Sequence, residues 1–326
     1  MNLVFNNMLQ HYYSILGGQH KDAYKEIYVG LMTFKDTIAI TATTDEDVYA
    51  IFNYVLLDNP IIFYASTYSY SVDSSNYVNT ISPVYIDDLS LVKKYINSIS
   101  EYLKKFDAIK SMNDFDKEVY VHDFCIQNLK YDVVFNAYSQ TIIGAIFYNQ
   151  AVCAGIAKFV KLVFDYVGLK SIVVSGDAKC PSTGEMQGHA WNVVEVNNNY
   201  YHLDVTFDMT ITDKNTRYDY FNLTDVDIMK DHAFEKNMPV CKSIAHNYFD
   251  SKSIHFKSNS ELKAYLRQSL KKRLSSVFFK LSYNQDEYEI LQLAQIQFPY
   301  ILFVGNKIEI RSNKQQGVYE LIFNAN

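Results

Sequence analysis

The chain has 326 residues, of which 48% are hydrophobic and 15% aromatic, and its formal net charge is −6 at pH 7. These values suit a packed globular protein of two or three domains and exclude an intrinsically disordered chain. The negative balance argues against a nucleic-acid partner, because tracking a phosphate backbone requires a basic face. A short basic patch at Lys271-Lys272-Arg273 is interpreted as a solvated face of a predicted helix.

The first residues carry neither a basic leader nor an apolar run of signal-peptide length, and no segment has the roughly 20 apolar residues needed to span a bilayer. We therefore expect a cytoplasmic protein from the sequence as written, and a secreted or surface-associated one if a leader has been trimmed. The cysteines form no Cys-x-x-Cys pair and are too few for a disulfide framework, which slightly favours a reducing compartment. They are Cys125, Cys153, Cys180 and Cys241.

The two ends of the chain show the same order of predicted elements. The N-terminal end is expected to contain a helix at 22–36, a strand at 38–41, a helix capped by Thr44, a strand at 61–64 and a hairpin within 67–85. The C-terminal end is expected to contain a strand at 278–282, a helix broken by Pro299, a strand at 301–304 and a hairpin-like segment at 307–323. We interpret residues 20–86 and 260–324 as two copies of one small α/β module, with chance similarity as the alternative.

Between these modules lies a central block that opens with a predicted helix at residues 113–129. We expect three domains: an N-terminal α/β module over residues 1–108, a core over 109–250 and a C-terminal α/β module over 251–326. The chemically informative spacings in the sequence all fall within the core.

A helix is predicted to begin at Cys153, because apolar residues follow at helical spacing and Gly168 ends the pattern as a C-cap. These apolar residues are Ile156, Phe159, Val160, Val163, Phe164 and Val167. Unpaired N–H groups and the helix dipole stabilise a thiolate at a first turn, which favours Cys153 as a nucleophile. The small neighbours Ala154 and Gly155 would let a substrate approach. A lone cysteine at a helix start is more often structural, so its placement alone does not decide its role.

A hairpin is predicted from residues 188–196 and 200–206, with three asparagines at 197–199 between the strands. If the first two asparagines form the turn, His189 and Asp204 lie on one face as diagonal neighbours, about 7–8 Å apart at Cα. A three-residue turn would place them on opposite faces. A hydrogen bond between His189 and Asp204 is therefore expected only if the turn has two residues.

Nucleophilic catalysis requires a thiolate, a base within reach and a group that orients the base. Cys153, His189 and Asp204 supply these three in chain order. Other residues could take the same roles: His202 as a base, Asp208 as a carboxylate and Asn192 as an orienting amide. Because Asn192 points to the other face from His189, Asp204 is preferred.

Three runs of sequence, at residues 152–157, 188–192 and 201–208, resemble the bacterial transglutaminase-like family in the same order. The resemblance extends over about residues 118–235 through His122-Asp123, Lys130-Tyr131-Asp132, residues 218–223 and Asp231-His232. It implies a papain-like α+β core, in which a helix bearing the nucleophile faces an antiparallel sheet. It assigns nucleophile, base and orienting acid to Cys153, His189 and Asp204. Phe207 stands where relatives usually have tryptophan, and we interpret this position as packing.

The resemblance implies attack on an amide carbonyl to give a thioester acyl-enzyme. We expect a peptidase, an amidase or a glutamine acyl transferase that acts on a peptide or protein without a metal or other cofactor. The backbone N–H of Cys153 is a candidate oxyanion donor, and Gln150 is a side-chain candidate. A loop at Asp177–Gln187 would shape the cleft. The alternatives are a non-catalytic binding or scaffolding protein that retains the fold, and a metal protein with Cys and His ligands.

Overall fold

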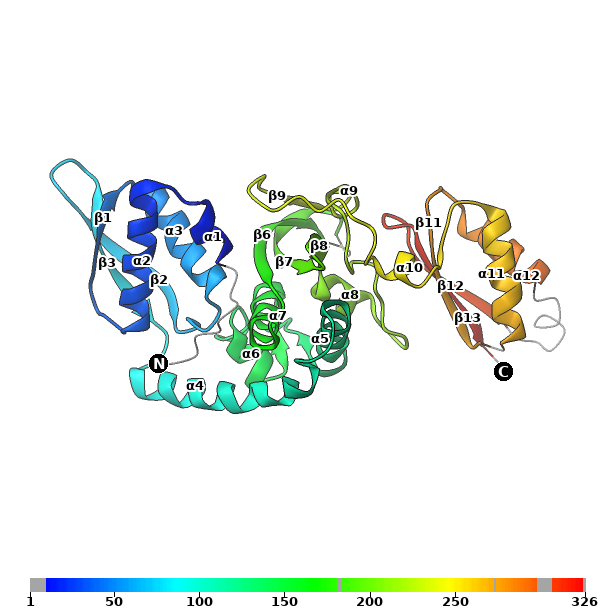
Figure 1. The fold of residues 1–326 in the computed structure, drawn as a ribbon, viewed down its shortest axis with the longest axis horizontal. Helices are drawn as coiled ribbons and strands as arrows, with labels where there is room; N and C mark the ends of the chain where they lie inside the picture. Colours follow the sequence, from blue (N-terminus) through cyan, green and yellow to red (C-terminus); the bar gives the residue numbers. More distant parts are fainter. Residues whose placement is uncertain (1–9, 181–182, 273, 298–306, 325–326) are drawn as a thin grey trace.

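The computed structural model describes residues 10–180, 183–272, 274–297 and 307–324. They form a row of three units, with an N-terminal α/β unit, a central unit and a C-terminal α/β unit (Figure 1). Helix α4 (Leu89–Leu103) runs beneath the first two units and connects them. Within the described part of the chain, every helix is too short or too polar to cross a lipid bilayer.

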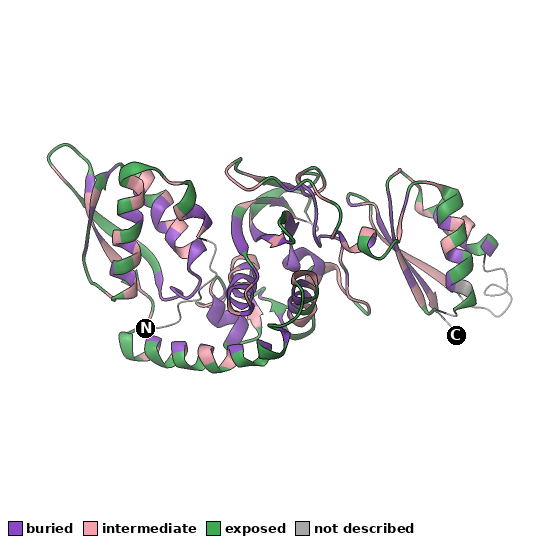
Figure 2. Cartoon of the chain, viewed as in Figure 1, coloured by how far each residue is buried: buried purple, intermediate pink, exposed green. Residues whose placement is uncertain are grey.

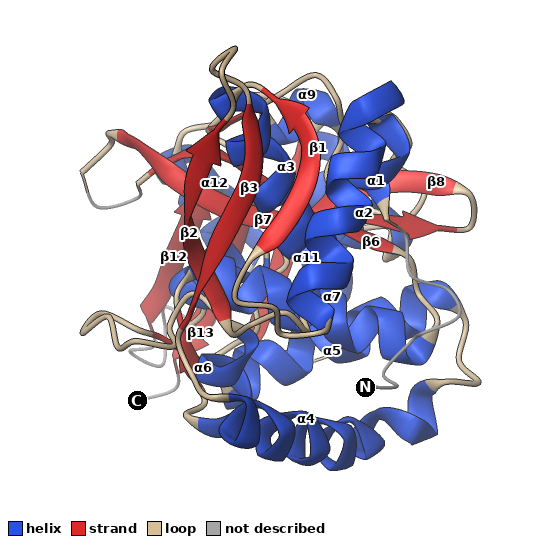
Figure 3. Cartoon of the chain, turned by 90° about the vertical axis from the view of Figure 1, so that its left-hand side faces the viewer, coloured by secondary structure: helices blue, strands red, loops and turns tan. Residues whose placement is uncertain are grey.

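The N-terminal unit is a three-stranded antiparallel sheet with helices packed against it (Figure 3). Its elements are α1 (His11–Ile15), α2 (Gly18–Met32), β1 (Ile38–Thr43), α3 (Asp45–Asp58), β2 (Ala65–Val72) and β3 (Val78–Tyr85). Helix α3 starts as predicted, because the side chain of Thr44 accepts a hydrogen bond from the N–H of Asp47. The predicted strand at 61–64 is wrong, since these residues form a buried turn that leads into β2.

The central unit contains a four-stranded antiparallel sheet in the order β8-β7-β6-β9. Helix α7 packs against β6 and β7 of this sheet, and burial is concentrated there (Figure 2). The elements are η1 (Lys104–Ile109), α5 (Asp114–Asn128), β4 (Lys130–Tyr131), α6 (Ile142–Phe147), β5 (Gln150–Ala151), α7 (Cys153–Val167), β6 (Ser171–Lys179), β7 (Met186–Val196), β8 (Asn199–Leu203), α8 (Val205–Ile211), α9 (Asp225–Ile228), β9 (His232–Phe234) and α10 (Tyr248–Ser251).

Helix α7 begins at Cys153 and ends at Val167, and its C-cap Gly168 has a φ of 80°, in the left-handed conformation that glycine adopts freely. Gly155 is buried on this helix, and a Cβ at this position would collide with the backbone oxygens of Ser139 and Thr141. The prediction that Gly155 leaves room for a substrate is therefore wrong. Its missing side chain instead lets the preceding loop pack against the first turn of α7.

The β7–β8 hairpin has the predicted two-residue turn. Val196 pairs with Asn199, and the turn residues Asn197 and Asn198 have φ values of 49° and 61°. Asparagine tolerates this left-handed region better than most residues, which explains the local choice of sequence. The register that this turn sets continues along both strands.

The return strand of the hairpin is shorter than predicted. It stops at Leu203 instead of continuing to Thr206, because Asp204 becomes the N-cap of α8. Oδ1 of Asp204 accepts a hydrogen bond from the N–H of Phe207 at 3.0 Å. A carboxylate at an N-cap satisfies an amide that the helix itself cannot pair.

The C-terminal unit has a hydrophobic core of its own, whereas the N-terminal and central units share one. Its elements are β10 (His255–Phe256), α11 (Asn259–Lys271), β11 (Ser276–Leu281), α12 (Glu287–Gln297), β12 (Lys307–Asn313) and β13 (Val318–Asn324). The strand order β11-β13-β12 matches β1-β3-β2 of the N-terminal unit, as the predicted repeat requires. The predicted strand at 301–304 lies outside the described residues.

Both outer units are hydrogen-bonded to the central unit. The hydroxyl of Tyr12 donates to the carbonyl of Val173 in β6 at 2.8 Å. From the C-terminal unit, Nε2 of Gln316 donates to the carbonyl of Asp227 at 3.1 Å and to Oδ2 of Asp231 at 3.4 Å. Each outer unit therefore donates side-chain hydrogen bonds to residues of the central unit.

Candidate active site

Cys153, His189 and Asp204 lie together, although they come from three different elements. They occupy the first turn of α7, strand β7 and the N-cap of α8, respectively. Nε2 of His189 lies 2.7 Å from Oδ2 of Asp204, and His189 and Cys153 line the same cavity, where each affects the ionisation of the other. Because an ionised carboxylate only accepts, Nε2–H is the donor and Nδ1 is left for the sulfur.

The charges in this group favour a thiolate–imidazolium pair. Burial raises the pKa of Cys153, but its hydrogen bond to His189 and the positive charge there outweigh burial, so the pKa falls below its ordinary value. Burial lowers the pKa of His189, while the charge of Asp204 and its hydrogen bond raise it, with a net rise to about 10. Burial also opposes ionisation of Asp204, yet His189 and His232 hold its pKa well below the usual range.

A second histidine shares the same carboxylate. Nε2 of His232, the first residue of β9, lies 3.0 Å from Oδ2 of Asp204, and its Nδ1 lies 2.6 Å from Oδ1 of Asp231. Both ring nitrogens therefore face acceptors, which favours the doubly protonated ring. Burial lowers the pKa of His232, but its hydrogen bonds to the two aspartates give a net rise. The sequence assigns no role to this residue, although the Asp231-His232 pair belongs to the family resemblance.

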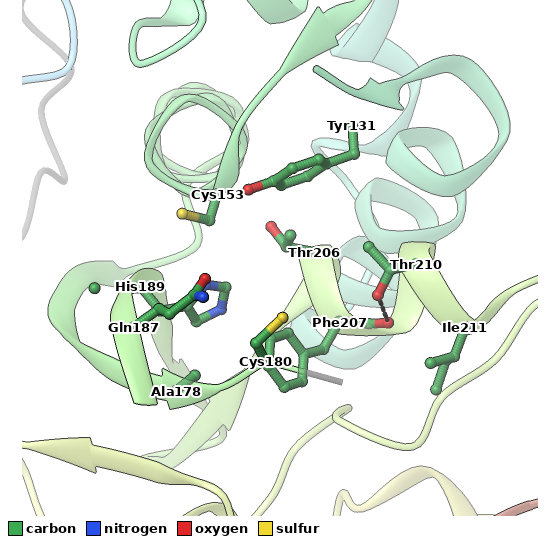
Figure 4. Close-up of a pocket in the computed structure, with 11 residues that line it drawn as sticks. Tyr131, Cys153, Ala178, Cys180, Gln187, His189, Thr206, Phe207, Thr210 and Ile211 are labelled. Atoms are coloured by element: carbon green, nitrogen blue, oxygen red, sulfur yellow. Dashed lines mark hydrogen bonds between the residues drawn. The ribbon is translucent and has the colours of Figure 1, made fainter. Parts of the chain in front are cut away.

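The group opens into a cavity of about 320 Å³ (Figure 4). Its other walls include Tyr131, Cys180, Gln187, Thr206, Phe207 and Ile211. Strand β4 pairs in parallel with β5, which sets Tyr131 beside Ala151 and near the start of α7. The Tyr131 hydroxyl points toward Cys153. Burial raises the pKa of Tyr131, so the hydroxyl remains a hydrogen-bond donor at neutral pH.

Phe207 packs against the catalytic candidates, with its ring 4.8 Å from that of His189 and 4.7 Å from that of His232, centroid to centroid. One feature of this cavity differs from the expectation. The predicted loop at Asp177–Gln187 is shorter, since its first residues belong to β6 and its last to β7. Cys180 and Gln187 nevertheless line the cavity.

His202 and Asn192 have structural partners elsewhere. Nδ1 of His202 accepts from the indole N–H of Trp191 at 3.0 Å, and its Nε2 donates to Oδ1 of Asp225 at 2.9 Å. Trp191 only donates, so this pairing fixes the tautomer of His202. Nδ2 of Asn192 donates to the carbonyl of Ala157 beneath α7, at 3.0 Å. Neither residue lines the cavity.

Asp208 and Gln150 are also held outside the cavity. Oδ2 of Asp208 lies 3.1 Å from Nε2 of His122, and both side chains are fully buried. Nε2 of Gln150 donates to Oδ1 of Asp132 at 3.2 Å. The oxyanion role of Gln150 remains a prediction, and Tyr131, Gln187, Thr206 and Thr210 are side-chain donors that line the cavity.

Two groups among the described residues bring possible metal-ligand atoms within 4.8 Å of one another: His189, Asp204 and His232, and His202, Asp225 and Cys241. In the first group, both histidines donate to one carboxylate oxygen. In the second, His202 and the backbone N–H of Cys241 donate to the two oxygens of Asp225. Hydrogen bonding accounts for the short spacing in each group.

Neither a scan against protein-family models nor a search of curated proteins gives a match. Similar solved structures include a candidate cysteine protease from Cytophaga hutchinsonii, with 14% identity, a TM-score of 0.27, and coverage of 43% of this chain and 61% of that chain. A TGase has 16% identity and a TM-score of 0.29, and the match covers 47% of this chain and 47% of that chain. A candidate protease from Parabacteroides distasonis has 14% identity and a TM-score of 0.25, and the match covers 43% of this chain and 36% of that chain.

The chain thus spans less than two thirds of each of these solved chains. With TM-scores this low, the matches assign neither an activity nor a role to any residue. The chemistry of the site rests on its own geometry.

Proposed function

We propose that the protein is a cysteine-nucleophile enzyme that acts on amide bonds of peptides or proteins through a thioester at Cys153. The supporting observation is that Cys153 and His189 line one cavity able to admit a substrate chain, while His189 is hydrogen-bonded to Asp204 at 2.7 Å. This arrangement provides a charged nucleophile, a proton carrier and an orienting carboxylate in contact with one another.

In the proposed reaction, the Cys153 thiolate attacks the amide carbonyl carbon and forms a C–S bond. The tetrahedral intermediate then breaks its C–N bond, and the His189 imidazolium gives its proton to the leaving amine. Water or a primary amine next attacks the thioester, with His189 taking its proton, and the C–S bond breaks to restore the thiolate. The first acceptor makes the enzyme a peptidase or amidase, and the second makes it a glutamine acyl transferase.

The oxyanion of the tetrahedral intermediate requires donors beside the thiolate. The backbone N–H of Cys153 is available in this scheme because the first amides of a helix have no partner within it. The Tyr131 hydroxyl is the second proposed donor, on the basis of its direction toward Cys153 in Figure 4. The role proposed for His232 is to hold Asp204 and to balance its charge, acting through that carboxylate.

The nucleophile is tested by brief alkylation with iodoacetamide between about pH 5 and pH 9, followed by mass spectrometry of each cysteine peptide. We expect Cys153 to react first and at the lowest pH. The buried Cys125 and Cys241 are internal controls, because burial raises their pKa values. A His189→Ala variant should slow labelling of Cys153 at neutral pH by about tenfold or more, since each pKa unit changes the thiolate fraction tenfold. Equal reactivity of all four thiols would overturn the proposal.

The acceptor is tested with a blocked glutamine peptide, offered with and without a primary amine. A peptidase or amidase releases an acid product in both cases, and an acyl transferase forms the amine adduct only when the amine is present. Cys153→Ala should abolish either product. If the wild type reacts with iodoacetamide but turns over neither glutamine amides nor peptide bonds, the non-catalytic alternative is favoured.

A further inference from the structure

A second cavity, of about 450 Å³, lies between the N-terminal and central units. Tyr54 and Leu57 of α3 contribute one wall, and Ala154 and Lys158 of α7 contribute another. Ala190 of β7 also lines it. The cavity is therefore formed only when the two units are packed together.

This cavity abuts the reactive pair. Ala154 directly follows Cys153 on α7, and Ala190 directly follows His189 on β7. The first cavity contains Cys153 and His189 themselves. The second cavity is thus lined by the sequence neighbours of both Cys153 and His189, one residue along from each.

Lys158 brings an uncompensated positive charge to the second cavity. Its Nζ donates to the carbonyl of Gln140 at 3.3 Å, and it forms no ion pair with any carboxylate in the described ranges. Burial lowers the pKa of Lys158 to about 8, against a smaller opposing contribution from the charge of Cys153, so the ammonium is still mostly charged at neutral pH. The exposed Glu235 also lines the cavity, and it accepts a hydrogen bond from Asn237 at 3.0 Å. An ammonium has three donors, which leaves two for a ligand.

We propose that the second cavity binds a carboxylate of the substrate, with Lys158 as its counter-ion and the tyrosine and leucine of α3 against the adjoining side chain. The inference rests on the proposed function and narrows its substrate class to peptides with a carboxylate close to the reacting amide. A partly desolvated ammonium attracts an anion more strongly than an ammonium in open water does. A mixed apolar and charged lining is typical of sites that orient a small ligand.

The charge of the site is tested by comparing two alkylating probes of similar size, iodoacetate and iodoacetamide, at Cys153. Lys158→Met should lower the ratio of the iodoacetate rate to the iodoacetamide rate about fivefold, as expected for the loss of one charge roughly 8 Å from the reagent. Lys158→Arg should retain most of the ratio. The matched control is Lys170→Met, which removes an exposed lysine paired with Glu195 and should leave the ratio unchanged.

A Lys158→Met variant that slows both probes equally would overturn the proposal, because Lys158 would then act only on the thiolate. An unchanged ratio would overturn it as well. The circular dichroism spectrum and the Tm of each variant report whether the fold is retained. The outcome is separate from that of the proposed function, since His189-dependent labelling of Cys153 by neutral iodoacetamide tests the nucleophile alone.

The source of the carboxylate is tested by protection of Cys153 from iodoacetamide. Three peptides serve as probes: acetyl-Ala-Ala-Leu amide, the same peptide with a free C-terminus, and acetyl-Ala-Glu-Leu amide. Stronger protection by the second peptide indicates a terminal carboxylate, and stronger protection by the third indicates an acidic side chain. Either advantage should disappear in Lys158→Met. If neither carboxylate peptide protects better than the neutral one, the proposal fails.

Discussion

His189 and His232 donate to the same carboxylate oxygen, Oδ2 of Asp204. His232 also reaches Asp231, so that two aspartates and two histidines alternate in one hydrogen-bonded series, of which Asp204, His232 and Asp231 are buried. Each positive ring lies between acceptors, and the carboxylate at the centre stays ionised without direct access to water. Asp204 is therefore held by two cations rather than one.

Replacing His232 by alanine should weaken the site through Asp204. The Asp204 carboxylate would lose one of its two charged donors, so its pKa would rise toward about pH 5, the lower end of the labelling range. We expect Cys153 labelling to fall about tenfold at neutral pH, since a hydrogen bond to a charged group contributes about 1.5–3 kcal/mol. The loss should be larger at about pH 5 than at pH 7, because Asp204 would begin to be protonated there.

The control for this variant is His255→Ala, which removes a histidine paired with Asp250 in the C-terminal unit. It should leave the pH profile of Cys153 labelling unchanged. A His232→Ala protein that folds and labels with the wild-type pH profile would show that His232 does not act through Asp204.

Asp204→Asn should separate the two tasks of Asp204. Oδ1 caps α8 through the N–H of Phe207, whereas Oδ2 accepts from the histidines. An asparagine can keep the capping oxygen while it turns an amide N–H₂ toward His189. We expect urea denaturation to show that Asp204→Asn lowers the free energy of unfolding less than Asp204→Ala does, by about the 1 kcal/mol that the cap contributes, while labelling falls by about tenfold and turnover by about 10³-fold or more. Comparable losses of stability in Asp204→Asn and Asp204→Ala would contradict this division.

Tyr131→Phe tests the proposed oxyanion donor. Removal of one such donor typically lowers kcat about 10²–10³-fold with little change in KM, because the bond forms in the transition state. Alkylation of Cys153 should be nearly unaffected, since that reaction forms no tetrahedral oxyanion. Tyr120→Phe, at an exposed tyrosine of α5, is the control. A parallel loss of alkylation and turnover would instead indicate that Tyr131 supports the thiolate.

The asparagine turn gives a prediction about stability. Asn198 has a φ of 61°, a conformation that costs ordinary L-residues about 1–2 kcal/mol and β-branched residues more. We expect Asn198→Val to lower the free energy of unfolding by about 1–2 kcal/mol and Asn198→Gly to change it little. Urea denaturation measures both. Equal losses for glycine and valine would show that the side chain, rather than the backbone conformation, stabilises the turn.

Local sequence was sufficient where one segment determines its own geometry. The apolar spacing after Cys153 predicts α7, and the paired asparagines predict the hairpin register, because both depend on residues adjacent in the chain. The alternating pattern through Asp204 predicts that the strand continues to Thr206. The pattern does not reveal that the Asp204 side chain accepts a backbone hydrogen bond as the N-cap of α8, which ends the strand. His232 and Lys158 could not be assigned from spacing. Their neighbours come from segments far apart in sequence.

The hydrogen bonds of Gln316 give the C-terminal unit a mechanical connection to the site. This side chain and the hydroxyl of Tyr220 both donate to Oδ2 of Asp231, whose other oxygen holds His232 and, through it, Asp204. A fragment that ended at residue 250 would lack one of those donors and open Asp231 to water. The C-terminal unit therefore supplies one of the donors that hold the chain of contacts from Asp231 through His232 to Asp204.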